Sequence, residues 1–221
     1  MVDGRYHHGE LRGTLLDVAE ALIRERGIDG WSLREASARI GVGPSAAYHH
    51  FDSRDALVRA LSERVIARLG ERMGRAAARA RGGGGGQQRL VAVSRAYVRW
   101  AVEDPAVARL AFRAGATGPE IAISLHPHDV LVAELDRLVD AGGLPAVARP
   151  GAEFIVWPAV HGLATLLIDG LVHFDSERAV DREVERLVRA VLTGLAHETP
   201  PSPAWPSGRS SQSERRARAR R

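Results

Sequence analysis

The sequence predicts an all-α protein: a small three-helix unit at the N-terminus, one long connecting helix, and a larger helical domain after it. Two observations support this fold class. Alanine, leucine, valine and arginine dominate the 221 residues, and aromatic residues make up only 5%; most of these common residues are compatible with helices. Apolar residues also recur at three- and four-residue intervals, the spacing of helices that bury one face. The length allows one large domain or a small and a medium one.

The first helix is predicted to begin near Glu10 and to stop at Gly27. Its apolar positions are Leu11, Leu15, Val18, Ala19, Leu22 and Ile23. They follow the helical spacing of a segment that packs on one side. Residues 1–9 before it form a short arm, in which Arg5, His7 and His8 are available to a phosphate or a groove. An ordinary flexible terminus explains the arm equally well.

A helix, a tight turn and a second short helix are predicted between Ser32 and Phe51. Ser32 followed by Glu35 has the form of a capping box, in which each side chain satisfies a free backbone N–H at a helix start. The glycines of Gly41-Val42-Gly43 permit a sharp turn, and Pro44 suits the first position of the next helix. This is the helix-turn-helix pattern, whose second helix enters the major groove of DNA.

The second helix of the motif is expected to continue through residues 46–50 towards Phe51. Ala46 and Ala47 are small enough for close approach to DNA. Hydrogen-bonding groups come from Ser45, Tyr48, His49 and His50. A helical hairpin with histidines on its surface is the competing interpretation, because short motifs also occur by chance.

A long helix is predicted after the Asp52-Ser53 cap. Arg54, in its first turn, can reach a phosphate beside the motif or pair with Asp55. An apolar stripe follows, formed by Leu57, Leu61, Val65, Leu69 and Met73. A basic ridge lies beside it, formed by Arg64, Arg68, Arg72, Arg75 and Arg79. We interpret this ridge as a solvated face rather than a DNA-binding surface, and the glycines of residues 82–86 as a flexible linker.

Five further helices are predicted in the C-terminal part. They cover residues 89–100, a segment that starts at Asp104-Pro105, and residues 129–141, 152–172 and 176–196, with residues 115–128 as a loop. The most apolar stretch, residues 154–172, is interrupted by Pro158, His161, Gly162, Asp169 and Gly170, so it does not qualify as a membrane span. The long, apolar final helices favour pairing with a second copy through a symmetric interface, although an internal core is the alternative. Residues 199–221 are rich in proline, serine and arginine, which predicts disorder.

The charge distribution limits how this chain can bind nucleic acid. There is no lysine, and 31 basic residues face 27 acidic ones. Residues 1–55 hold 7 arginines and 9 acidic residues, so the helix-turn-helix segment is not basic as a block. Contacts to phosphate must therefore come from a few placed groups. Cysteine is absent, which excludes disulfides and thiolate chemistry and fits a cytoplasmic location.

An enzyme is the less favoured alternative. His126-Pro127-His128-Asp129 is a candidate metal cluster, but the HExxH spacing is missing. The sequence also lacks a nucleophile elbow. It lacks a phosphate loop as well, because Gly82 to Gly86 is not followed by the lysine and serine that such a loop needs. We expect no catalytic residues, no cofactor and no bound metal.

Three segments together resemble the DNA-binding domain of the TetR/AcrR family of one-component repressors. They are RYHHGELRGTLLDVAEALIRERG, the capping box with its turn, and YHHFDSRDAL. The resemblance covers roughly the first 60 residues. It implies DNA contacts by the second helix of the motif, with Ser45, Tyr48 and His49 at positions that commonly meet DNA and Arg54 at a position that contacts phosphate. The full set of candidate DNA-contacting residues is Ser32, Arg34, Pro44, Ser45, Ala46, Tyr48, His49 and Arg54.

The second half resembles the subgroup with a WHG-type C-terminal domain. AYVRWAVEDPAVARLAF and WPAVHGLATLL carry this resemblance, with Trp157, His161 and Gly162 in the spacing W-x-x-x-H-G. Pro158 departs from the pattern, because proline inside a helix removes a hydrogen bond. Trp157 and His161 share one helix face, and the candidate ligand-binding residues are Tyr97, Trp100, Phe112, Phe154, Trp157 and His161. Ordinary core packing is the equal alternative for them.

The resemblance implies a homodimer that binds a palindromic, double-stranded DNA operator and is released when a small-molecule effector enters the C-terminal domain. A DNA-binding regulator without an effector is the alternative. The expected organisation is a DNA-binding domain over residues 1–55 and a connecting helix and linker over 56–86. After these come a ligand-binding and dimerisation domain over residues 87–198 and a disordered basic tail over residues 199–221.

Overall fold

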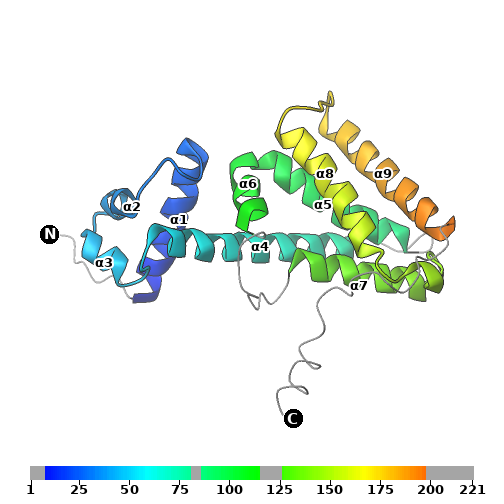
Figure 1. Ribbon diagram of the computed structural model, residues 1–221, viewed down its shortest axis with the longest axis horizontal. Coiled ribbons are helices and arrows are strands. Elements are labelled where there is room, and N and C mark those ends of the chain that lie inside the picture. The colour runs from blue at the N-terminus through cyan, green and yellow to red at the C-terminus, as the bar shows by residue number, and fades with distance from the viewer. Residues whose placement is uncertain (1–7, 81–85, 115–125, 198–221) are drawn as a thin grey trace, which may run out of the picture.

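The computed structural model describes residues 8–80, 86–114 and 126–197, and within them every regular element is a helix (Figure 1). The elements are α1 (His8–Arg26), α2 (Leu33–Arg39), α3 (Pro44–Tyr48), α4 (Arg54–Arg79), α5 (Gln87–Glu103), α6 (Pro105–Ala114), α7 (Pro127–Asp140), the 3-10 helix η1 (Ala146–Ala148), α8 (Glu153–Ile168) and α9 (Glu177–His197). The predicted all-α class is confirmed. Most of the predicted arm and loop, the glycines 82–85 and the tail lie outside the described residues.

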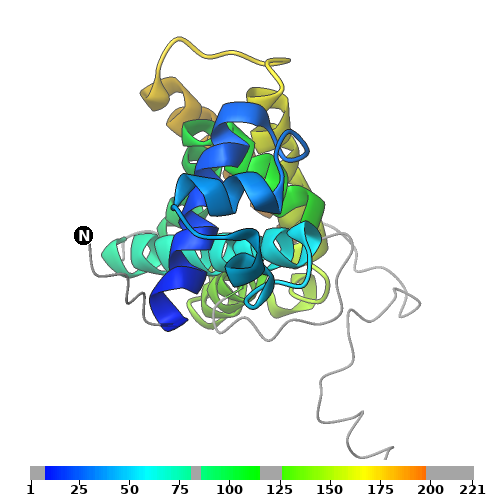
Figure 2. The same cartoon turned by 90° about the vertical axis from the view of Figure 1, so that its left-hand side faces the viewer.

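The molecule has two hydrophobic cores that are joined by α4. Helices α1, α2 and α3 surround the N-terminal half of α4 and form the head, which faces the viewer in Figure 2. Leu57, Leu61 and Val65 of α4 belong to the head core. Leu69 and Met73, further along the same stripe, belong to the core of the body. One helix face therefore supplies both cores, as its apolar spacing predicts.

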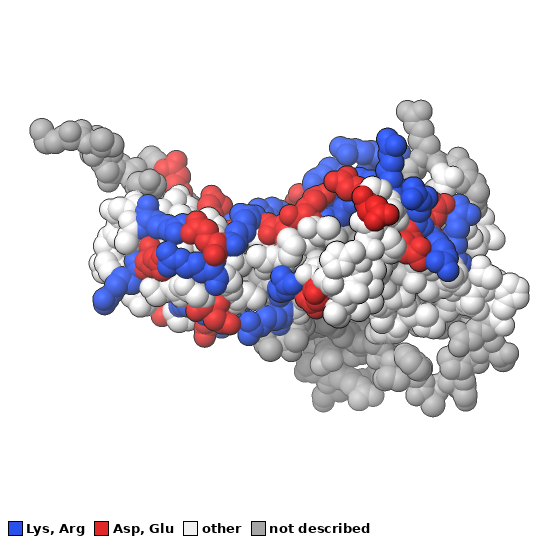
Figure 3. Space-filling model, turned by 90° about the horizontal axis from the view of Figure 1, so that it is seen from above, with Lys and Arg blue, Asp and Glu red and all other residues white. Residues whose placement is uncertain are grey.

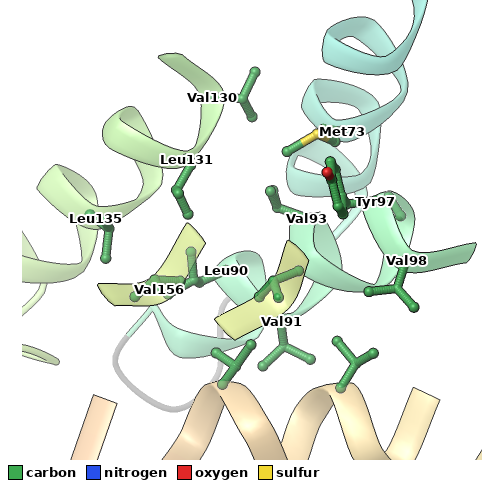
Figure 4. Close-up of a cluster of buried hydrophobic side chains, with 14 of the residues drawn as sticks. Met73, Leu90, Val91, Val93, Tyr97, Val98, Val130, Leu131, Leu135 and Val156 are labelled. Atoms are coloured by element: carbon green, nitrogen blue, oxygen red, sulfur yellow. The ribbon is translucent and has the colours of Figure 1, made fainter. Parts of the chain in front are cut away.

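The body is built around α5, which packs against α4, α7, α8 and α9. Figure 4 shows Leu90, Val93 and Tyr97 of α5 directed into the core. Leu131 and Leu135 reach the same core from α7. Among the described residues, no helix is long and apolar enough to cross a membrane.

Helix α6 is shared between the head and the body. Val107, Leu110 and Ala111 are buried in the head core together with side chains of α1 and α4. Ala108 belongs to the body core, and Phe112 packs against it. The short helix thus fixes the orientation of the head relative to the body, which periodicity alone did not reveal.

The arginine ridge of α4 is solvated only in part: Arg68, Arg75 and Arg79 are exposed, but the ridge also pairs with acidic residues of neighbouring helices. Arg64 and Arg68 both contact the carboxylate of Glu20 on α1, at 3.0 and 2.6 Å. Arg72 forms two hydrogen bonds with Glu103 of α5, at 2.6 and 2.7 Å. Figure 3 shows acidic and basic side chains interleaved over one face of the head and the body. The ridge joins neighbouring helices because their acidic residues face it.

Helix ends differ from the prediction at three places. Helix α3 stops at Tyr48 instead of continuing towards Phe51. Helix α7 begins at Pro127, where the ring of His126 accepts a hydrogen bond from the backbone of His128. Helix α8 continues through Pro158 and ends at Ile168. It tolerates the proline because Pro158 lies in its second turn on an exposed face, so that solvent can reach the carbonyl left unpaired.

Candidate DNA-binding surface and ligand pocket

The helix-turn-helix begins at a capped helix, although the cap is only half of the predicted capping box. The hydroxyl of Ser32 accepts a hydrogen bond from the backbone N–H of Glu35 at 3.2 Å. The Glu35 carboxylate instead pairs with Arg26 of α1 at 2.6 Å. The acidic side chain therefore ties α2 to α1, because a guanidinium lies within its reach.

The turn between α2 and α3 depends on one residue with positive φ. Gly41 has φ +73°, a conformation that glycine adopts without steric cost. The N–H of Val42 then donates to the carbonyl of Ser37 at 3.1 Å. Pro44 starts α3, and Ala47 on that helix is fully buried. The turn thus holds α3 against the head with its opposite face free.

The free face of α3 presents most of the predicted DNA-contacting side chains. Tyr48 is 52% exposed, and Ser45 and His49 are also exposed. These three residues share one side of the helix, because they are three and four positions apart. The remaining predicted residues of the motif lie close in sequence: Ser32, Arg34 and Pro44 are exposed and Ala46 is half-buried.

Arg54 is bound within the head. Its guanidinium donates a hydrogen bond to the carbonyl of Ile28 and lies 5.0 Å from the centre of the Trp31 ring. It also lies 3.5 Å from the carboxylate of Asp29 and 3.4 Å from that of Asp55. In this arrangement Arg54 holds the loop after α1 against the start of α4. Its phosphate contact stays a prediction.

Arg12 is a cation beside the motif that sequence reasoning missed. Its guanidinium lies 5.2 Å from the centre of the Phe51 ring, and Phe51 lies three residues beyond the end of α3. Arg12 is exposed, and no carboxylate pairs with it among the described residues. The stacking keeps a positive charge near the end of α3. Only the fold brings the first turns of α1 to this position.

Five aromatic rings gather where α5, α6 and α8 meet. Tyr97 lies 5.0 Å from Trp157 and 6.1 Å from Phe112, measured between ring centres. His161 lies 4.4 Å from Phe112 and is stacked parallel to Trp157 at 6.4 Å. Trp100 closes the cluster at 6.3 Å from Tyr97. The cluster brings together five of the six residues predicted to bind a ligand.

A pocket of about 380 Å³ opens beside this cluster. Tyr97, Phe112, Trp157 and His161 line it. Trp100 belongs to the cluster but not to the pocket wall, and Phe154 is 41% exposed elsewhere on α8. The other lining residues were not predicted: they are Ile66, Leu69, Ala111, His126, Pro127 and His128. Their positions depend on how α4 and α7 pack, which the sequence does not reveal.

Tyr97 and His161 form a hydrogen-bonded polar pair in the pocket, which His126 and His128 also line. The hydroxyl of Tyr97 lies 2.8 Å from Nδ1 of His161. Burial raises the pKa of Tyr97 and lowers the pKa of His161, so both groups are neutral near pH 7. In the tautomer in which the neutral tyrosine donates to Nδ1, the ring proton lies on Nε2. His161 can then donate a hydrogen bond to an acceptor on a ligand.

The histidines of the pocket do not form a metal site of the usual kind. Within the described residues, no three histidine, aspartate or glutamate side chains gather closely enough to hold a metal ion. His128 lies 3.8 Å from the carboxylate of Asp129, and His126 accepts a hydrogen bond from the start of α7. This stretch, a candidate metal cluster in the sequence, serves as a helix start at the mouth of the pocket.

The fold and these two sites define the class of helix-turn-helix regulators with a separate helical body. Residues 15–61 match the bacterial regulatory proteins of the tetR family, and residues 90–191 match the tetracyclin repressor-like C-terminal domain. A search of curated protein sequences gave no match. The chain belongs to the TetR family.

Solved structures of the same fold span nearly the whole chain. A protein of unknown function from Rhodococcus sp. RHA1 is 28% identical, with a TM-score of 0.70 over 88% of this chain and 100% of that one. A TetR-family transcriptional regulator from Pectobacterium atrosepticum is 23% identical, with a TM-score of 0.63 over 90% and 100%. RolR in complex with resorcinol is 17% identical, with a TM-score of 0.58 over 88% and 97%.

We predict that His161 titrates below the ordinary histidine pKa of 6.5, because burial disfavours its charged form. Between the lowered value and 6.5 the unfolded chain binds more protons than the folded one, so stability must fall as pH drops below 6.5. An NMR titration of the histidine ring signals measures the pKa, and the signal absent in His161→Gln assigns it. Urea unfolding at two pH values should show a weaker pH dependence in His161→Gln. A pKa at or above 6.5 contradicts this account of the pocket.

Proposed function

We propose that this protein is a ligand-responsive transcriptional regulator, acting as a repressor that binds a palindromic operator as a homodimer and leaves it when a small molecule binds. The observation that carries this proposal is that α6 contributes side chains both to the head core and to the aromatic pocket. Leu110 is buried in the head core, whereas Phe112 lines the aromatic pocket. A ligand that shifts Phe112 therefore acts on the helix that orients the head.

Sequence-specific contacts are assigned to α3 and phosphate contacts to arginines around it. Ser45, Tyr48 and His49 offer hydroxyl, phenol and imidazole groups to base edges and phosphates. Arg12 and Arg34 are exposed and form no ion pair among the described residues. Free guanidinium groups are the cations that neutralise phosphates. A few such contacts, doubled by two-fold symmetry, are enough for an operator site.

Tyr48→Ala should weaken operator binding about tenfold to hundredfold, the range of one lost base contact. The operator is first identified by selecting bound fragments from genomic DNA, and affinity is then measured by fluorescence anisotropy. Val147→Ala, a truncation of an exposed side chain on η1 in the body, is the matched control and should keep full affinity. Unchanged binding by Tyr48→Ala, with a normal circular dichroism spectrum in both variants, would remove α3 from the proposed role.

The effector is expected to be a small, largely flat molecule with a hydrogen-bond acceptor. The pocket of about 380 Å³ has aromatic walls and, in the imidazole of His161, a potential hydrogen-bond donor. Such pockets bind ligands by apolar contact with a few orienting polar groups. RolR, which shares the fold, binds the small aromatic diol resorcinol. The ligand can shift the equilibrium only by its difference in affinity for the two head orientations.

A panel of small aromatic alcohols, acids and amines should contain compounds that raise the melting temperature of the protein and lower its operator affinity. His161→Phe keeps a ring in the stack but removes the donor, so binding of these compounds should weaken about tenfold. Isothermal titration measures binding, and anisotropy measures DNA release. A compound that needs His161 for binding but leaves operator affinity unchanged would favour the alternative of a regulator without an effector response.

We assign the homodimer interface to α8 and α9, because these helices leave apolar surface exposed. Phe154, Ile155 and Leu166 of α8 are each about 40% exposed. Ile155 also borders a hollow between α8 and α9, together with Val191 and Leu195. A helix that is apolar on several sides needs a partner on each of them. A second copy placed by a two-fold axis supplies one.

Ile155→Arg should convert the dimer into a monomer, because an unpaired charge in a desolvated contact costs several kcal/mol. Sedimentation velocity measures the change. Val147→Arg introduces the same charge at a side chain that is 59% exposed on η1, and it should remain dimeric. A wild-type monomer, or an Ile155→Arg dimer of unchanged stability, would contradict this interface.

A further inference from the structure

A second pocket, of about 510 Å³, lies where the head meets the body. Its walls come from α1 and the loop after it, from α6, and from the C-terminal end of α8. Ile28, Ala106 and Ile168 supply apolar surface from these three parts. Phe112 borders this pocket and also the aromatic pocket described above. The two pockets are thus neighbours that share one side chain.

Arginines outnumber acidic residues in the lining of the second pocket, although each of them is paired with a carboxylate. Arg24 of α1 and Arg109 and Arg113 of α6 line it, against the single acidic residue Asp169. Arg109 and Arg113 are four positions apart and project from the same face of α6. Thr165, on the α8 wall, has a buried hydroxyl without a hydrogen-bond partner among the described residues. Such a group is satisfied when a polar ligand atom comes within reach.

The arginines are held by ion pairs that a ligand can exchange. Arg113 pairs with Asp29 at 3.2 Å, and the two side chains are 65% and 73% exposed. Arg109 pairs with Asp169 at 3.0 Å, again with both side chains nearly half exposed. Exposed pairs contribute little to stability. A carboxylate on a bound molecule can therefore replace these partners at small cost and accept hydrogen bonds from two guanidinium groups.

We propose that this pocket binds an organic anion with a flat apolar body and one carboxylate. The apolar body lies against Ile28, Ala106 and Ile168, and the carboxylate lies between Arg109 and Arg113. Because the walls belong to both the head and the body, the occupant bridges them. It is a site separate from the aromatic pocket, which is lined by no arginine among the described residues.

The test uses the full-length protein without DNA and two probes of equal shape, 2-naphthoate and 2-naphthamide. By isothermal titration, naphthoate should bind the wild type about tenfold more tightly than the amide, because only the acid is charged. The double variant Arg109→Gln/Arg113→Gln should lose this preference. Ala106→Phe fills the pocket and should abolish binding of both probes. Arg186→Gln removes an arginine that is 79% exposed on α9 and should behave as wild type.

Three results would overturn the proposal: no binding of naphthoate to the wild type, equal affinity for the acid and the amide, or unchanged binding by Ala106→Phe. The last result would place the probe in the aromatic pocket. If circular dichroism shows that Ala106→Phe does not fold, the proposal is tested by whether the double variant Arg109→Gln/Arg113→Gln loses the preference for naphthoate. Because no DNA enters the assay, failure here leaves the proposed effector response intact.

Discussion

The structure depends on the apolar stripe of α4, which two cores share. A unit of about 50 residues buries little surface, so the head gains stability by packing against neighbouring helices. Its core is completed by Leu57, Leu61 and Val65 of α4 and by Val107 and Leu110 of α6. The head core is therefore completed by helices that also belong to the body. This constraint makes DNA-binding geometry sensitive to changes in the body.

Ion pairs strengthen the same junction. The carboxylate of Glu20 is almost fully buried and contacts Arg24, Arg64 and Arg68. Burial alone would raise the pKa of Glu20, but the hydrogen bonds and charges of Arg68 and Arg24 outweigh it and lower the pKa. Arg24 also reaches Asp104, next to the start of α6. Part of the acidic balance of the first 55 residues thus reflects docking of the head, through Asp17 and Glu20, onto arginines of α4.

Much of the fold could be predicted from the sequence, because local patterns determine it. Ser32 caps its helix, the stripe of α4 is buried, and the glycine turn has positive φ at Gly41. Which helices pack against one another could not be predicted. Arg12 reaches Phe51, and Ala111 lines the aromatic pocket, only because segments distant in sequence pack together. Phe154 is the converse case: it was a candidate lining residue, but α8 leaves it 41% exposed and outside the pocket wall.

Helix α6 contributes to two cores and to two pockets, so binding in one pocket can affect binding in the other. Phe112 is a wall of both pockets, so a ligand that moves its ring in one pocket changes the shape of the other. Thermodynamic linkage then requires that each ligand alter the affinity of the other by the same factor. The pocket between head and body also includes Ile28, next to Asp29, which pairs with both Arg54 and Arg113. Exchange of the Arg113 partner would thereby release one contact of the loop that Arg54 holds against α4, close to the helix-turn-helix.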